Sequence, residues 1–254
     1  MRVAVLTGGS SGIGAATARL LAENGWHCVL LARGEERLRA VAEQIGAEWE
    51  VCDVAAREAV DAVAARVRER HPAIALLVNG AGVPGRSSFV RSDPELIERV
   101  MRINYLGSVW PTRAFLPALE AAAPGAHVVN IVSVAGTVAA RAAGPYSASK
   151  HAQLAFSRSL TLELASQGIR VHTINPGFVE TDGFPQTRLL EHPVLRHAVA
   201  EPALVAKRIV AAVERGTVET FVPRWYRPAA VLQAIVPGTL ARVQAARRRR
   251  KAAG

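Results

Sequence analysis

Short apolar runs alternate with stretches of helical periodicity along most of this 254-residue chain. The runs are rich in Val, Ile and Leu, and the stretches between them repeat their apolar residues about every three or four positions. This order is typical of βαβ units, and strands this apolar are expected where helices cover both faces of a sheet. The alternation therefore predicts an α/β fold in which a single domain contains one doubly wound, seven-stranded parallel sheet.

The bounds of the expected elements follow from where the apolar patterns begin and end. The expected strands are Val3–Thr7, Cys28–Ala32, Glu48–Cys52, Ala75–Asn79, His127–Val132, Arg170–Asn175 and Thr220–Pro223. The expected helices are Gly12–Asn24, Glu35–Ile45, Arg57–Glu69, Asp93–Ala121, Tyr146–Gln167 and Pro202–Arg215. The connection over 183–202 contains three prolines and is irregular. Because a connection of this length is often functional, it predicts a lid, with an ordinary surface loop as the alternative.

The net charge of +10 is concentrated near the C-terminus. From Thr220 onward there are eight basic residues and no acidic ones, whereas the rest of the chain has 23 basic and 21 acidic residues. A nearly neutral body gives no support to nucleic-acid binding. The charge distribution predicts a globular domain over 1–223 and a basic extension over 224–254.

The extension has two interpretations. Its apolar residues, among them Val231, Leu232 and Ile235, precede the basic run Arg247–Lys251, a pattern that fits peripheral membrane contact. The favoured alternative is a pocket-lining helix or subunit contact followed by a solvated tail.

No apolar run reaches the roughly 20 residues of a membrane span, and no secretion signal is recognised. With only two cysteines, both in apolar strands, the chain is expected to be cytoplasmic.

A glycine-rich turn, Thr7–Gly14, follows the first strand and opens the first helix. Small residues at Gly8, Gly12 and Gly14 let backbone N–H groups and the helix N-terminus approach a pyrophosphate, although a purely structural turn remains an alternative. The second strand ends in Arg33, where a carboxylate would bind the ribose hydroxyl of NAD. A guanidinium suits a 2′-phosphate, so NADP(H) is favoured over NAD(H), a solvated arginine being the alternative.

Tyr146 and Lys150 lie four residues apart at the start of an expected helix, so both side chains project from one face. A tyrosine with a pKa of about 10 needs nearby positive charge to transfer a proton at neutral pH. Lys150 is the expected cation. Ser133 ends the fifth strand, where a parallel sheet presents ligands, and is expected to hydrogen-bond a substrate carbonyl, although serines at strand ends are more often structural.

Six segments, in this order, resemble the short-chain dehydrogenase/reductases of about 250 residues, with their TGxxxGIG and YxxxK motifs. They are Thr7–Gly14, Asn79–Gly82, Asn104–Gly107, Ser133, Tyr146–Lys150 and Asn175–Thr181. The resemblance implies a Rossmann-type fold and a hydride transfer with Tyr146 as proton donor or acceptor. It also implies that Lys150 binds the nicotinamide ribose and that Asn104 holds a water between Lys150 and solvent. Gly80 departs from the family, which usually has asparagine there, and is expected to change a turn more than the chemistry.

The predicted site follows from these motifs. The predicted catalytic residues are Asn104, Ser133, Tyr146 and Lys150. The predicted cofactor contacts are Gly8, Ser10, Ser11, Gly12, Ile13, Gly14, Arg33, Asp53, Val54, Asn79, Ala81, Gly82, Tyr146, Lys150, Pro176, Gly177, Val179 and Thr181. No metal site is predicted, because the histidines show no ligand spacing such as H-E-x-x-H.

The expected activity is the NADP(H)-dependent interconversion of a ketone or aldehyde and an alcohol. A 3-oxoacyl-thioester reductase is the alternative within the same class, and a non-catalytic NADP(H) sensor is the alternative outside it. The expected partner is a small carbonyl or alcohol substrate, and the resemblance implies a homodimer or homotetramer.

Overall fold

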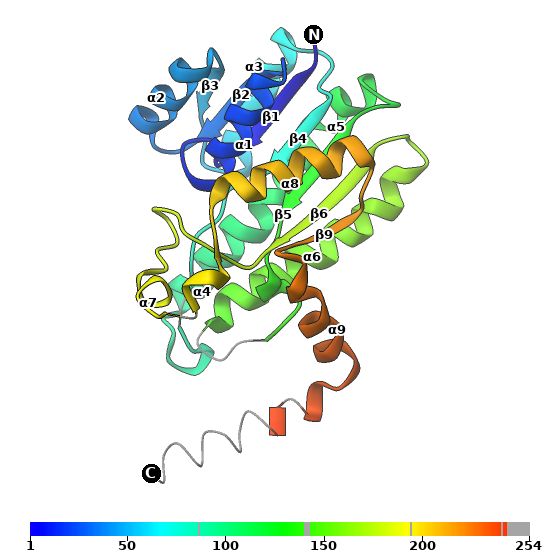
Figure 1. Ribbon diagram of the computed structural model, residues 1–254. Coiled ribbons are helices and arrows are strands. Elements are labelled where there is room, and N and C mark those ends of the chain that lie inside the picture. The colour runs from blue at the N-terminus through cyan, green and yellow to red at the C-terminus, as the bar shows by residue number, and fades with distance from the viewer. Residues whose placement is uncertain (86, 140–142, 194, 240, 243–254) are drawn as a thin grey trace.

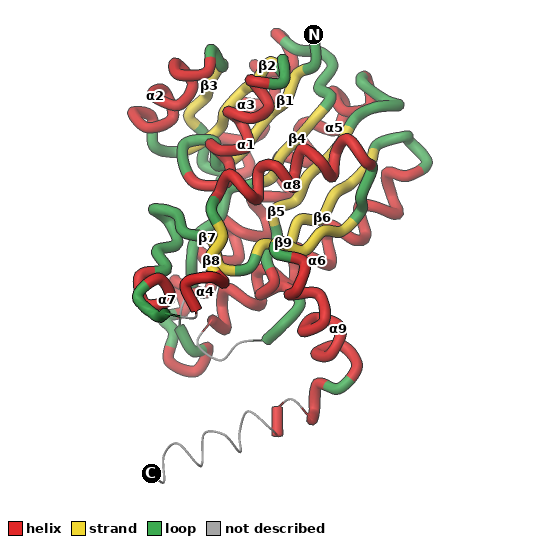
Figure 2. Tube along the Cα trace, viewed as in Figure 1, coloured by secondary structure: helices red, strands yellow, loops and turns green. Residues whose placement is uncertain are grey.

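A computed structural model describes residues 1–85, 87–139, 143–193, 195–239 and 241–242. Its centre is a seven-stranded, wholly parallel sheet with strand order β3-β2-β1-β4-β5-β6-β9, visible as the yellow strands of Figure 2. The strands are β1 (Val3–Thr7), β2 (His27–Ala32), β3 (Glu48–Val51), β4 (Leu76–Asn79), β5 (His127–Ile131), β6 (Arg170–Pro176) and β9 (Glu219–Val222). The order reverses direction between β1 and β4, so the predicted doubly wound sheet is confirmed.

Helices cover both faces of this sheet (Figure 1). They are α1 (Gly12–Glu23), α2 (Glu35–Ile45), α3 (Arg57–Arg70), α5 (Gly107–Ala121), α6 (Gly144–Ala165) and α8 (Pro202–Arg215), while α4 (Pro94–Met101) packs on α6. Within β1, Ala4 and Leu6 pack with α1, α2 and α8, whereas Val3 and Val5 pack with α3, α5 and α6. The apolar strand β1 thus contributes to two cores at once, as helices on both faces require.

Three features differ from the expected elements. The expected helix Asp93–Ala121 is divided into α4 and α5 by a π-helical turn, Arg102–Leu106. The irregular connection contains the short helix α7 (Thr187–Leu190), and it lies between two two-residue strands, β7 (Phe178–Val179) and β8 (Val199–Ala200), which pair in parallel. After β9, the extension forms α9 (Arg227–Ile235), which projects away from the sheet in Figure 1.

The described residues contain no helix that is both long and apolar enough to cross a membrane. Cys28 and Cys52 are buried free thiols, and burial raises the pKa of Cys28 to about 12. Both cysteines therefore act as small apolar residues of the strand layer. The basic run Arg247–Lys251 lies outside the described residues.

Candidate active site

A cavity of about 330 Å³ opens at the carboxyl edge of the sheet, where β4, β5 and β6 end. Ser133, Tyr146 and Lys150 line it together. Ile13 and Thr181, from two of the predicted cofactor segments, line it as well. Most of the other lining residues are apolar. In open α/β sheets, ligands bind in such a crevice beside the strand ends, so the site lies where the topology places it.

The glycine turn between β1 and α1 is shaped by close backbone approach. Gly8 and Gly12 have φ values of 72° and 54°, a region that side chains disfavour. A Cβ on Gly14 would lie 2.2 Å from the carbonyl oxygen of Gly8, so the turn and the first helical residues must touch. Such a bare backbone before a helix N-terminus fits the pyrophosphate of a dinucleotide. Ser10 and Ser11 lie in the same turn and are half-buried.

Gly80 contacts the glycine turn directly, which explains the departure at this position. A Cβ on Gly80 would lie 2.9 Å from the carbonyl oxygen of Thr7, and the Thr7 hydroxyl accepts hydrogen bonds from the N–H groups of Gly80 and Ala81. Glycine here lets the end of β4 pack against the end of β1. Gly82 continues this segment into the cavity, where a Cβ would lie 3.4 Å from Asn104 Oδ1 and 3.9 Å from Lys150 Nζ.

Asn79 lies apart from the cavity. Its side chain is 1% exposed and donates hydrogen bonds to Thr112 Oγ1 at 3.0 Å and Asn130 Oδ1 at 2.9 Å. Its side chain therefore joins β4 to β5 and α5 and does not line the cavity, and the cofactor contact at Asn79 stays a prediction. Sequence alone gives a strand-end asparagine no direction, so this distinction needed the structure.

Arg33 is exposed directly after β2, beyond the glycine turn. Arg33 forms no ion pair within the part of the chain that the structure describes, so its guanidinium is available to an anion. Asp53 and Val54 lie just after β3, the strand that pairs with β2. Asp53 Oδ1 accepts a hydrogen bond from Ala55 N at 3.0 Å, and Val54 is 5% exposed, packed against Gly107. Val54 is therefore part of the packing at this edge.

Lys150 is buried more deeply than its position on a helix suggests. It is 4% exposed, and Nζ donates to the carbonyl of Ile131 at 3.0 Å and to Gln153 Oε1 at 2.7 Å. Nζ also lies 5.8 Å from the centre of the Tyr146 ring. Burial lowers the pKa of Lys150 to about 7, so the charge that the sequence analysis assigned to this residue is opposed by its surroundings.

Gln153 is a site residue that the sequence analysis missed. Its Oε1 accepts from Lys150, and its Nε2 donates to Ser108 Oγ at 2.8 Å. Ser108 in turn donates to the backbone carbonyl of Asn104 at 3.4 Å. A continuous chain of hydrogen bonds thus joins Lys150 to Asn104 through two fully buried polar residues. A glutamine three positions after a lysine on a helix carries no distinctive sequence signal.

Asn104 lies within the π-helical turn, which α6 and α4 enclose. Its Nδ2 donates to the Val83 carbonyl and to Ser149 Oγ, and its Oδ1 accepts from Val83 N at 2.8 Å. These bonds fix the segment after Gly82 against α6. Single π-helical turns occur frequently at functional sites, and here the turn directs a side chain toward the cavity-lining segment.

Ser133 is 8% exposed, and its hydroxyl accepts from Ala135 N at 3.1 Å and donates to the Pro176 carbonyl at 3.4 Å. The second distance is long for an O–H donor, so the hydroxyl retains capacity for another acceptor in the cavity. Pro176, Gly177, Val179 and Thr181 line the same cavity. Thr181 packs on the glycine turn, because a Cβ on Gly12 would lie 2.9 Å from Thr181 Cγ2.

The connection that the sequence analysis predicted to be a lid reaches the candidate proton donor. The ring of Phe184 lies 5.7 Å from that of Tyr146, centre to centre, and Gln186 also lines the cavity. Tyr226, from the turn before α9, completes the lining, and its ring packs on Gly177. Residues on both sides of the predicted domain boundary at 223 therefore contribute to one cavity.

The low pKa of Lys150 makes the free energy of unfolding depend on pH. Because the pKa falls from 10.5 to about 7 on folding, the unfolded chain binds more protons between those values and stability rises with pH across this window. We expect the wild type to gain up to about 1.4 kcal/mol per pH unit relative to Lys150→Met between pH 7 and 10. Urea unfolding at several pH values measures this difference.

The matched control is Lys207→Met, which removes an exposed lysine from α8. A constant difference between wild type and Lys150→Met across the pH range would show that Lys150 is not buried in the way described.

A parallel sheet with a glycine turn, and with half-buried Tyr146 beside buried Lys150 at its carboxyl edge, is an arrangement typical of a nucleotide-dependent oxidoreductase. A sequence model of the family described as short chain dehydrogenase matches residues 2–190, and this chain belongs to that family. Members of this family are oxidoreductases that act on CH–OH groups with NAD(P). The fold described above agrees with this assignment.

Individual relatives agree with this assignment. A 3-oxoacyl-[acyl-carrier-protein] reductase of Bos taurus is 36% identical over 183 residues, 71% of this chain and 77% of the relative. A short chain dehydrogenase/reductase of Burkholderia phymatum in complex with NAD has a TM-score of 0.83 at 26% identity, covering 94% of this chain and 95% of that one. An alcohol dehydrogenase of Thermococcus sibiricus complexed with 5-hydroxy-NADP has a TM-score of 0.77 at 26% identity, covering 87% and 95%.

Proposed function

We propose that this enzyme interconverts a ketone or aldehyde and an alcohol with NADP(H), and that Tyr146 transfers the proton. The observation that carries the proposal is the convergence of Ser133, Tyr146 and Lys150 on one cavity with the cofactor segments around Gly12, Gly82 and Pro176. A carbonyl oxygen placed between two hydroxyl groups has a hydrogen-bond donor on each side. The glycine turn fits the dinucleotide, because Gly8 and Gly12 have positive φ values and bring side-chain-free backbone to the N-terminus of α1.

The residues of this chain divide the proton chemistry between them. When bound, the nicotinamide cofactor supplies or accepts the hydride. Ser133 hydrogen-bonds the substrate oxygen, and Tyr146 donates its hydroxyl proton to that oxygen in the reductive direction. Protonated Lys150 stabilises the resulting Tyr146 phenolate. Gln153 positions the Nζ of Lys150 through its hydrogen bond. The chain Lys150–Gln153–Ser108 reaches the carbonyl of Asn104, the residue for which the family resemblance implies a water between Lys150 and solvent.

The preference for NADP(H) rests on Arg33. This exposed guanidinium follows β2, where a 2′-phosphate would lie, and a charge-assisted contact is worth about 1.5–3 kcal/mol. The alcohol dehydrogenase structure named above carries an NADP derivative, which supports the preference. The dehydrogenase/reductase from Burkholderia phymatum carries NAD, so family membership alone leaves the choice to residues such as Arg33.

A panel of ketones, aldehydes, 3-oxoacyl thioesters and secondary alcohols, assayed with NADP(H) and NAD(H), tests function and cofactor together. We expect turnover with NADPH and an increase of about 10–100-fold in the KM for NADPH in Arg33→Ala, with little change for NADH. Arg39→Ala is the control, because Arg39 is also exposed but lies within α2, away from the end of β2. Tight NADPH binding without turnover of any panel member would favour a sensor over an enzyme. Equal KM values in both variants would remove Arg33 from the cofactor site.

Two substrate classes fit the cavity. Its lining is mostly apolar apart from the catalytic groups, which favours ketones with apolar substituents. The likeness to a 3-oxoacyl-[acyl-carrier-protein] reductase supports a 3-oxoacyl thioester as the alternative substrate. The panel separates these classes because it contains both.

Location and assembly belong to the same proposal. We place the enzyme in the cytoplasm as a homodimer or homotetramer, the assembly that the family resemblance implies. Peripheral membrane contact through the extension remains the alternative for residues 224–254. Val231, Leu232 and Ile235 of α9 are 48%, 48% and 71% exposed, which fits an apolar contact surface in either case.

A further inference from the structure

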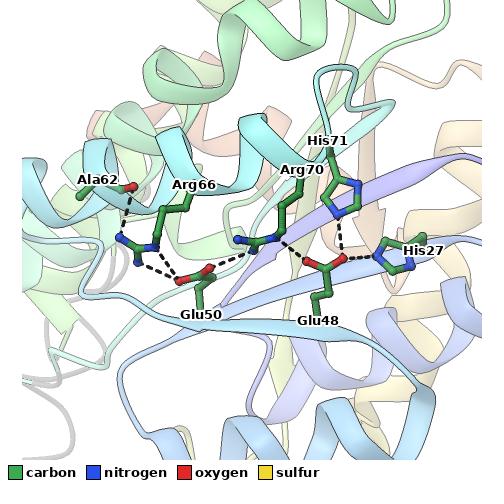
Figure 3. Close-up of polar contacts among 7 residues, drawn as sticks. All are labelled: His27, Glu48, Glu50, Ala62, Arg66, Arg70 and His71. Carbon is green, nitrogen blue, oxygen red and sulfur yellow. Dashed lines mark hydrogen bonds and ion pairs between the residues drawn. The ribbon is translucent and has the colours of Figure 1, made fainter.

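A second polar cluster lies at the amino edge of the sheet, opposite the edge that carries Tyr146 (Figure 3). His27 is the first residue of β2, Glu48 is the first residue of β3, and His71 directly follows α3. Three elements that are distant in sequence thus bring two imidazoles and one carboxylate together. The catalytic chemistry proposed above uses none of these side chains.

The three side chains converge on a single point. Glu48 Oε1 lies 2.7 Å from His27 Nε2 and 2.8 Å from His71 Nε2. The three ligand atoms all lie within 4.8 Å of one another, and the two rings are 5.0 Å apart, centre to centre. Figure 3 shows both rings pointing their Nε2 atoms at the same carboxylate oxygen. The side chains of His27, Glu48 and His71 are 21%, 32% and 11% exposed, which leaves access for an ion and a water molecule.

The carboxylate is charged and held in place. Burial alone would raise the pKa of Glu48, but hydrogen bonds from His27, His71 and Arg70 together lower it to about 2. Arg70 donates to the other oxygen, Oε2, at 2.9 Å, and also to Glu50 Oε1 at 2.9 Å. Glu50 is held in turn by Arg66 at 2.8 Å. This outer network directs Oε1 toward the histidines, as outer residues commonly do for metal ligands.

We propose that His27, Glu48 and His71 form a binding site for a divalent metal ion of the zinc type. Two neutral imidazoles and a carboxylate are ligands that Zn²⁺ accepts, and a water completes a tetrahedron. Tetrahedral bonds of about 2.0–2.2 Å place ligand atoms about 3.3–3.6 Å apart, so both nitrogen–oxygen separations must open by about 0.5–0.9 Å, which side-chain rotation provides. The ion would connect β2, β3 and α3 and stabilise the outer end of the sheet.

Binding of Zn²⁺ to the full chain, freed of any affinity tag, tests this site. Equilibrium dialysis is expected to give one zinc per chain in the wild type, with at least about a 100-fold loss of affinity in His71→Gln and His27→Gln. Glutamine keeps a donor for Glu48 but is a poor zinc ligand. The exposed His192→Gln is the matched control and is expected to bind zinc like the wild type. Circular dichroism of each variant checks its fold.

A second measurement does not depend on any variant. Zinc is expected to raise the Tm of the wild-type chain in proportion to the logarithm of its concentration, because it binds the folded state alone. Excess chelator should reverse that shift while leaving NADPH-dependent turnover unchanged, which separates this site from the catalytic one. No binding by the wild type at micromolar zinc would overturn the proposal. Equal affinity in wild type, His27→Gln and His71→Gln would overturn it too.

Discussion

Tyr146→Phe is expected to lower kcat by about 10²–10⁴-fold, the usual effect of losing a positioned proton donor. The substitution removes only the hydroxyl. The ring contact with Phe184 at 5.7 Å and the position over Lys150 Nζ at 5.8 Å depend on the aromatic ring and persist. Folding and NADPH binding should therefore be retained, and the loss should appear in the rate of NADPH oxidation with an accepted ketone.

Tyr105→Phe is the matched control for this experiment. Tyr105 lies beside Asn104 in the π-helical turn, and its ring contacts Phe156 at 6.4 Å without lining the cavity. Removing the Tyr105 hydroxyl should change kcat by no more than about twofold, which corresponds to RT ln 2 in the activation free energy. If Tyr146→Phe turned over an accepted ketone as fast as Tyr105→Phe, another group would have to carry the proton.

Gly14→Ala is expected to destabilise the protein by about 1–3 kcal/mol and to abolish measurable NADPH binding. Helix propensity alone predicts the opposite sign, because alanine is favoured over glycine in a helix by about 1 kcal/mol. The added Cβ would lie 2.2 Å from the Gly8 carbonyl oxygen and 2.8 Å from its carbon. Backbone atoms cannot move aside as a flexible side chain can, so the whole turn must shift.

The effect on cofactor binding follows from the same displacement. Gly8 packs closely on Gly80 and Ala81, since a Cβ on Gly8 would lie only 2.9 Å from their backbone atoms. Moving the turn would break this contact. Thermal unfolding and fluorescence titration with NADPH measure both losses. Gly183→Ala is the control, since open space surrounds that position and its backbone is not left-handed. A Gly14→Ala variant as stable as Gly183→Ala, with normal NADPH affinity, would show that the turn is more deformable than its contacts imply.

The sheet could be predicted closely because its central strands are buried on both faces. Such strands are rich in apolar residues, so β1, Val3–Thr7, has the expected bounds, and the other six differ from the expected ranges by a residue at one end or both. The paired strands β7 and β8 have two residues each, too few for any periodicity. The π-helical turn at Arg102–Leu106 keeps a helical apolar pattern, so the sequence analysis predicted one continuous helix there.

The site was predictable where a motif specifies backbone shape, as at Gly12 and Gly14, and at Tyr146 with Lys150. It was less predictable where burial decides the chemistry. The sequence places Lys150 near Tyr146, but only packing shows that its ammonium is enclosed by Ile131 and Gln153. The residues His27, Glu48 and His71 come from three elements, and a search for ligand spacing along the chain does not find such a cluster.

The pairing of β7 with β8 fastens both ends of the segment that approaches Tyr146. Phe178 pairs with Val199 and Val179 with Ala200, so residues 180–198 leave and re-enter the fold at one place. A segment closed off in this way can change its length and composition while the seven-stranded sheet keeps its register. We therefore expect substitutions within 180–198 to alter substrate preference while the catalytic groups on the sheet and α6 keep their places.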